Sequence, residues 1–115
     1  MASGELYFAG GSDYELIETK TWLGTTLQLW RNGHMMTLTW GGNMNTTSTA
    51  GAKNQYITIP EAYRPPYNVW SICFDQNGKR FIFQASSSGN AGIYYQLDAV
   101  SSGTGCYGFI SWATK

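Results

Sequence analysis

Few residues in this chain have the chemistry that catalysis requires. The single histidine, His34, follows an Asn-Gly pair, where a hairpin turn leaves few side chains around it. Nucleophilic catalysis needs a base within hydrogen-bond reach of the nucleophile. A lone histidine beside a turn is more often a solvated surface residue, so we expect no catalytic role for it.

The carboxylates are the other candidates for acid–base chemistry. Glycoside hydrolysis needs two carboxyl groups across a cleft, in environments that separate their pKa values. The acidic residues are instead dispersed along the chain at Glu5, Asp13, Glu15, Glu18, Glu61, Asp75 and Asp98. The sequence therefore predicts a protein that is not an enzyme and has no catalytic residues.

The two cysteines do not form a metal-binding motif. Cys73 and Cys106 are far apart in the sequence and lack the close pairing of zinc sites. Both lie in apolar, strand-like segments, which favours buried free thiols, with a disulfide as the alternative. No phosphate-binding loop followed by a helix is present. We expect neither a metal nor a cofactor.

Aromatic residues with polar neighbours are better suited to binding a sugar. An aromatic ring covers the apolar face of a sugar ring, and nearby polar groups bind the hydroxyls. Two groups fit this pattern: Trp30 with Arg31 and His34, and Tyr94 with Gln96 and Asp98. The alternative for Trp30 is packing under a neighbouring sheet, loop or subunit, and for Tyr94 an ordinary position on a sheet surface.

The composition limits the kind of partner. The chain has 115 residues, 43% hydrophobic and 16% aromatic, which is enough for one domain with a core. Only 12% of the residues are charged, and seven Lys and Arg balance seven Asp and Glu. Nucleic acids and anionic membranes bind clustered cations. We therefore expect no nucleic acid, no membrane insertion, and an uncharged partner such as a sugar or another protein chain.

The N-terminal segment has no features of an export signal. It lacks a basic n-region and a long apolar run, and no segment approaches the roughly 20 apolar residues of a spanning helix. We expect synthesis in the cytoplasm without a signal peptide. Residues 1–13 are assigned to an N-terminal extension and residues 14–115 to one β-sandwich domain.

Two Asn-Gly pairs indicate β-hairpins, because each stands between alternating apolar positions. A two-residue turn at Asn32-Gly33 pairs Trp30 with Met35. The core face of this hairpin is then Leu27, Leu29, Met36, Leu38 and Trp40.

A two-residue turn at Asn77-Gly78 defines the second hairpin. It pairs Phe74 with Phe81, and Asp75 with Arg80 as a cross-strand ion pair. The core face is then Trp70, Ile72, Phe74, Phe81 and Phe83. Cys73 and Ile82 fall on the opposite face. The hairpin is therefore apolar on both sides, and we expect it to be central or covered by another chain.

Further strands are expected near residues 14–22, 55–59, 92–100 and 106–115, with an exposed loop between the hairpins. No segment shows sustained helical spacing. Short strands separated by regular turn signals indicate a sandwich or barrel. We predict an all-β fold, an antiparallel, jelly-roll-like β-sandwich of seven to nine short strands with no substantial helix.

Three motifs occur in an order that is similar to a known family. They are WRNGHM at residues 30–35, IPEAYRP at residues 59–65 and SWATK at residues 111–115. This order resembles the C-terminal head domains of tail-fibre and baseplate proteins from bacteriophages of Gram-positive bacteria, over roughly residues 25–115. Ala62 stands where glycine is common in that family.

The resemblance implies a non-catalytic receptor-binding, or adhesin, domain at the tail tip or baseplate of a virion. It implies a homotrimer that binds a host cell-wall or surface saccharide and contacts other phage tail proteins. The family varies most at its binding site, so no binding residue is carried over. The alternative is a structural assembly or capping module of a virion appendage that binds neighbouring protein subunits.

Overall fold

The computed structural model describes residues 14–114 and consists of antiparallel strands in one sheet. The strands are β1 (Glu15–Trp22), β2 (Thr25–Asn32), β3 (Met35–Asn43), β4 (Gly51–Thr58), β5 (Val69–Asp75), β6 (Arg80–Ala85), β7 (Asn90–Gln96) and β8 (Gly105–Ala113). A three-residue 3-10 helix, Glu61–Tyr63, lies between β4 and β5. The predicted all-β antiparallel fold is confirmed. The extension assigned to residues 1–13 lies outside the described residues.

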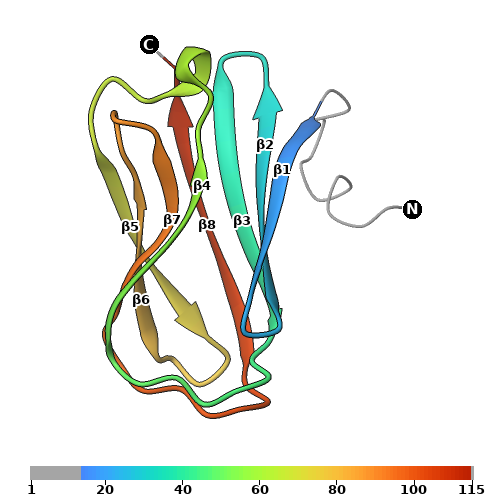
Figure 1. Cartoon of the computed structure of the whole chain (residues 1–115), viewed down its shortest axis with the longest axis vertical. Helices are drawn as coiled ribbons and strands as arrows, with labels where there is room; N and C mark the ends of the chain where they lie inside the picture. Colours follow the sequence, from blue (N-terminus) through green and yellow to red (C-terminus); the bar gives the residue numbers. More distant parts are fainter. Residues whose placement is uncertain (1–13, 115) are drawn as a thin grey trace.

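The sheet folds back on itself in two halves (Figure 1). One half contains β1, β2, β3 and β8, and the other contains β5, β6, β7 and β4. The halves join where β8 pairs with β5 through only two residue pairs, Phe74 with Tyr107 and Asp75 with Cys106. β4 also passes close to β1, so the sheet is nearly closed. Within residues 14–114 no helix is long and apolar enough to cross a membrane.

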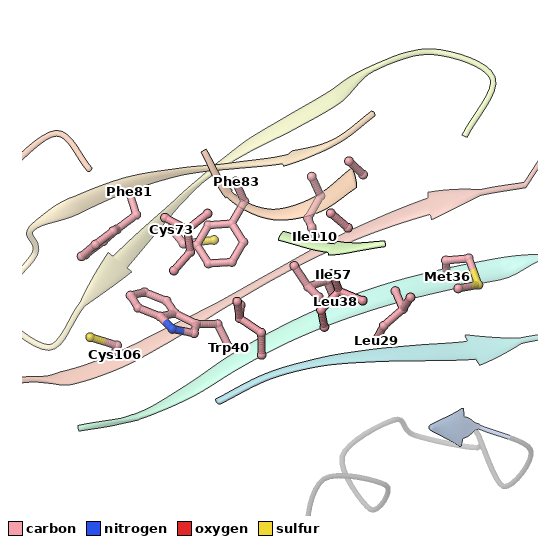
Figure 2. Close-up of a cluster of buried hydrophobic side chains, with 14 of the residues drawn as sticks. Leu29, Met36, Leu38, Trp40, Ile57, Cys73, Phe81, Phe83, Cys106 and Ile110 are labelled. Atoms are coloured by element: carbon pink, nitrogen blue, oxygen red, sulfur yellow. The ribbon is translucent and has the colours of Figure 1, made fainter. Parts of the chain in front are cut away.

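The core lies between the two halves (Figure 2). The Trp40 ring of β3 packs against Phe81 and Phe83 of β6, with ring centroids 4.8 and 5.4 Å apart. Its indole N–H donates to the hydroxyl of buried Thr25 at 2.9 Å. The core face predicted for the first hairpin is confirmed, since all its members are buried: Leu27, Leu29, Met36, Leu38 and Trp40.

The turn of the first hairpin lies one residue later in the chain than predicted, which shifts the pairing of the two strands by two residues. Asn32 pairs with Met35 and Trp30 with Thr37, so Gly33 and His34 occupy the turn. Gly33 has a φ of 63°, and a glycine at the first central position is typical of a type II′ turn. The predicted pairing of Trp30 with Met35 is therefore wrong. A shift of two residues leaves the same side chains facing the core.

The second hairpin has a three-residue loop in place of the predicted two-residue turn. The Asp75 N–H donates to the Lys79 carbonyl at 2.9 Å, and the Gly78 N–H donates to the Asp75 carbonyl at 3.1 Å. Gly78 has a φ of 79°, the left-handed conformation that completes a type I turn with a G1 bulge. Phe74 consequently pairs with Arg80, and Cys73 with Phe81.

This odd shift reverses the two faces of β5. Phe81 and Phe83 are buried as predicted, but the buried residues of β5 are Cys73 and Asp75. The predicted core positions of Trp70, Ile72 and Phe74 are wrong, and these side chains are 54%, 56% and 51% exposed.

The predicted ion pair between Asp75 and Arg80 is also wrong. The buried Asp75 Oδ1 accepts the backbone N–H groups of Asn77 and Lys79, each at 2.8 Å, and so holds the loop. Arg80 instead pairs with Asp98, with 3.0 Å between Nε and Oδ2. The loop geometry therefore separates the two charges that a shorter turn would have paired.

A β-bulge interrupts β7. Ile82 of β6 pairs with Tyr95, whereas Phe83 pairs with Ile93, so one extra residue is accommodated in β7. Tyr94 and Tyr95 are both partly exposed, and Gln96 is fully buried. The alternation expected for Tyr94, Gln96 and Asp98 therefore breaks after Tyr94.

Asp98 fastens the start of β6, and we predict an effect of pH on this contact. The side chain and the backbone N–H of Arg80 both donate to Asp98. These hydrogen bonds, of which the side chain's has the larger effect, lower the pKa of Asp98 to about 2, from an ordinary value of 3.8. A carboxyl group whose pKa is lower in the folded than in the unfolded state stabilises the fold above pH about 4, where it is ionised in both states. This stabilisation is lost as the pH falls to about 2. We expect Asp98→Asn to lower the Tm at neutral pH, and the Tm difference from wild type to shrink across this acid range in circular dichroism melts. A difference that stays constant between pH about 4 and 2 would contradict this role.

Candidate functional site

The first predicted sugar-binding group does not present its aromatic ring to solvent. Trp30 is only 4% exposed, and its indole N–H donates to the Thr39 hydroxyl at 3.0 Å. The ring therefore offers no open face on which a sugar could stack. This placement corresponds to the packed alternative for Trp30.

The polar members of that group have structural contacts. The Arg31 guanidinium pairs with Glu15 at 3.1 Å and lies over the Tyr63 ring, 5.2 Å from its centroid. Arg31 thereby ties β1 and β2 to the turn after β4. His34 is exposed in the hairpin turn, and its carbonyl accepts the Thr114 N–H at 2.8 Å. Trp30, Arg31 and His34 thus do not converge on one ligand position.

The bulge in β7 divides the second predicted group. Tyr94 is 40% exposed on the outer surface. Buried Gln96 accepts the Ser48 hydroxyl at 2.6 Å and donates to the carbonyls of Ser48 and Asp98. Asp98 pairs with Arg80. Gln96 therefore anchors the loop before β4 at Ser48, while most of that loop is exposed, as expected. Only Tyr94 of this group faces a possible ligand.

A row of large apolar side chains lies exposed on the outside of β5 and β8. We call it the outer aromatic face, and it consists of Trp70, Ile72, Phe74, Tyr107 and Phe109, each 51–64% exposed. With about 200 Å² for a fully exposed aromatic side chain, these fractions correspond to about 550 Å² of apolar surface. The largest such patch on a typical monomer is about 300–600 Å² and is often functional. The outer aromatic face is therefore the candidate binding surface.

The alternation of side chains along β8 determines which of its residues belong to this face. Ile110 and Trp112 pair with Leu38 and Met36 of β3 and are buried. Tyr107 and Phe109 therefore point outward, because neighbouring side chains in a strand point to opposite faces. Sequence reasoning missed both residues, although their alternation with Ile110 and Trp112 was the available signal.

A groove opens between β5 and β8, because these strands pair at one end only. Past the two paired positions at that end, side chains of β5 bond the backbone of β8. The Ser71 hydroxyl and the Cys73 thiol donate to the Phe109 carbonyl at 3.3 and 3.5 Å. The groove has a volume of about 630 Å³. Gly108 lies in its lining, and a Cβ at this position would come within 2.8 Å of the Cys73 Sγ. The absence of a side chain at Gly108 therefore allows the two strands to approach.

A second depression lies on the other side of Phe109, over β3 and β8. Its volume is about 620 Å³, and Thr37, Thr39, Tyr107 and Ser111 are among its lining residues. The hydroxyls of Thr37 and Ser111 lie 3.0 Å apart and share a hydrogen bond. Phe109 thus lies between two depressions that carry hydroxyl groups on their walls, and in the described part of the chain no charged side chain lines either one.

The side chains that line the two depressions are apolar or carry hydroxyl or thiol groups. Among residues 14–114 no three His, Cys, Asp or Glu side chains lie together as metal ligands. Searches against protein-family models and against curated proteins found no match for this sequence. The resemblance to phage head domains therefore stays a prediction from the three sequence motifs.

Both cysteines are buried free thiols, as predicted, and we expect them to be unreactive in the folded protein. Burial raises the pKa of Cys73, and it raises that of Cys106 to about 12 with a further contribution from Asp75. The thiolate is the reactive form. At pH about 8, iodoacetamide should leave the native mass unchanged and alkylate both cysteines in guanidinium chloride. Rapid labelling of native Cys106 in a mass spectrum would refute this assignment.

Proposed function

We propose that this chain is the receptor-binding, or adhesin, domain of a bacteriophage tail or baseplate protein, and that it binds host cell-surface carbohydrate without catalysis. The observation that carries the proposal is the exposed, uncharged outer aromatic face. The all-β antiparallel fold and the order of the three sequence motifs support it. In this proposal the domain belongs to a virion, at its tail tip or baseplate, and it contacts other tail proteins.

The carbohydrate contacts are centred on Phe109. This ring is 64% exposed and can cover the apolar face of a hexose. Thr39, Ser71 and Ser111 line the depressions on its two sides. Their hydroxyls bond Trp30, the Phe109 carbonyl and Thr37 within the chain, and each oxygen has a further lone pair that can accept a hydrogen bond from a sugar hydroxyl. Among residues 14–114, no charged side chain belongs to these linings, which favours a neutral saccharide over a phosphate-bearing polymer.

The contacts of the carboxylates favour binding over hydrolysis. Glu15 pairs with Arg31, Asp98 pairs with Arg80, and Asp75 holds the loop between β5 and β6. Glycoside hydrolysis requires two carboxyl groups that face each other across the substrate. The carboxylates with known contacts instead have structural partners away from the two depressions.

The second candidate function is an assembly or capping module that binds neighbouring subunits of the same appendage. The observation that favours it is the aliphatic side of the face, where exposed Ile72 pairs with Ile82 of β6. An isoleucine provides neither a flat ring nor a hydrogen-bonding group for a sugar. A contact centred on these side chains therefore suits a protein surface.

The carbohydrate proposal predicts that Phe109→Ala weakens binding to a neutral cell-wall polysaccharide by about tenfold or more, because the lost ring removes at least about 1.5 kcal/mol of apolar contact. Binding is measured by isothermal titration, after a glycan array of neutral and anionic polysaccharides from Gram-positive bacteria identifies the ligand. Phe109→Tyr retains the ring and should bind nearly as well as wild type.

Leu16→Ala provides the matched control, because Leu16 is 46% exposed on β1 and lines neither depression. It should bind like wild type. Failure of the wild-type protein to bind any polysaccharide on the array would overturn the carbohydrate proposal, and so would binding that Phe109→Ala leaves unchanged.

A further inference from the structure

The hydrogen-bond ladder between β5 and β8 stops at Phe74 and Tyr107. Continuation of the same register would place Ile72 opposite Phe109, but this pair does not form. The groove of about 630 Å³ lies along the unpaired part of the two strands. Two strand edges therefore face each other across the groove without a ladder between them.

The backbone of Phe109 points into this groove. The Thr114 N–H donates to the His34 carbonyl at 2.8 Å, directly after the last pair of β3 and β8. Because bonded residues alternate along an antiparallel strand, the even-numbered residues of β8 bond β3, and the odd-numbered residues direct their N–H and C=O groups toward β5. The Phe109 carbonyl has this direction, since it accepts the Ser71 hydroxyl at 3.3 Å.

The backbone of Ile72 points into the groove from the other side. The Gln76 N–H donates to the Gly105 carbonyl at 2.8 Å, at the start of β8. The same alternation makes the even-numbered residues of β5 face β8, and Ile72 lies two positions before the paired Phe74. The Ile72 carbonyl and the Phe109 N–H are therefore an acceptor and a donor on opposite walls of one groove.

We propose that this groove binds the acetamido group of an N-acetylated amino sugar. The C=O and N–H bonds of a trans amide point in opposite directions. One acetamido group can therefore accept from the Phe109 N–H of β8 and donate to the Ile72 carbonyl of β5. This inference rests on the proposed function, because it specifies the neutral saccharide whose ring stacks on Phe109.

The other groups of the groove suit the same ligand. In the described part of the chain no charged side chain lines it, so the ammonium group of an unacetylated amino sugar would have no partner. Trp70 and Ile72 provide apolar contact for the acetyl methyl group. An acetamido group carries its donor and its acceptor on separate atoms, and it therefore matches a donor and an acceptor on separate walls better than a hydroxyl does.

An extended peptide also carries amides, but the groove suits it less. A peptide strand pairs through a row of donors and acceptors along each edge. The Phe109 carbonyl already accepts the Ser71 hydroxyl and the Cys73 thiol, at 3.3 and 3.5 Å, which occupies both of its lone pairs. The row on β8 is thus interrupted, whereas a single acetamido group does not need this carbonyl.

Isothermal titration with two pairs of neutral sugars tests the proposal. The pairs are N,N′,N″-triacetylchitotriose with cellotriose, and N-acetylgalactosamine with galactose, and within each pair an acetamido group replaces a hydroxyl. In at least one pair we expect the N-acetylated sugar to bind about tenfold tighter or more, because only it satisfies both backbone groups. Acetyl-trialanine amide carries amides without a sugar ring and should bind about tenfold more weakly than that sugar.

An ester at Phe109 tests the donor directly. The Gly105–Cys106 junction allows ligation of a synthetic peptide of residues 106–115 without a change in sequence, and this peptide can carry an oxygen in place of the Phe109 N–H. We expect about tenfold weaker binding of the N-acetylated sugar and unchanged binding of its hydroxyl partner. The matched control is an ester at Ala113, on the same edge of β8 but outside the groove lining. Circular dichroism melts establish that both ester proteins are folded.

Absence of a preference in both sugar pairs would overturn the inference. A preference that the Phe109 ester leaves unchanged would also overturn it, and so would acetyl-trialanine amide that binds as tightly as the N-acetylated sugar. In each of these cases, polysaccharide binding that Phe109→Ala weakens would leave the proposed function standing. Failure of every sugar and polysaccharide to bind would overturn the proposed function, and this inference with it.

Discussion

The loop from Asp75 to Lys79 determines which face of β5 is buried, and much of the molecule depends on it. The Asp75 carboxylate accepts two backbone N–H groups of this loop, and Gly78 adopts the left-handed conformation that closes it. The resulting odd number of loop residues turns Cys73 toward the core. Asp75 also pairs with Cys106 of β8, so the same residue lies at the corner where the two halves of the sheet meet. One buried carboxylate thereby links the loop, the corner and the exposure of Trp70, Ile72 and Phe74.

The two Asn-Gly hairpins show which parts of the fold can be predicted from sequence. In both, the apolar alternation correctly indicated strands. The register error in the first hairpin was even, so Leu29 and Leu38 remained in the core. The error in the second was odd, and it reversed β5 because strand side chains alternate with a period of two. Asn-Gly fits several turn types, and here the additional hydrogen bonds of Asp75 accompany the longer loop.

The candidate site was less predictable, because both faces of several strands carry aromatic residues. In β8, Tyr107 and Phe109 alternate with Ile110 and Trp112, and pairing with β3 decides which pair is buried. Sequence reasoning chose Trp30, which the fold encloses, and it grouped Tyr94 with Gln96, which the bulge in β7 separates. The bulge could not be inferred from alternation, because one extra residue leaves no compositional mark. The prediction of buried free thiols required only apolar surroundings and is confirmed.

The chain has few charged residues, and several of them form ion pairs with each other. Arg31 with Glu15 and Arg80 with Asp98 fix the ends of strands, and the outer aromatic face between them is left uncharged. That face is not uniform. Its β8 side adjoins hydroxyls of Thr39 and Ser111, which can replace the hydrogen bonds that a sugar makes to water. Its β5 side centres on two paired isoleucines, which gain most from complete removal of water. One continuous surface therefore combines a region suited to a hydroxyl-rich ligand with a region suited to another protein layer.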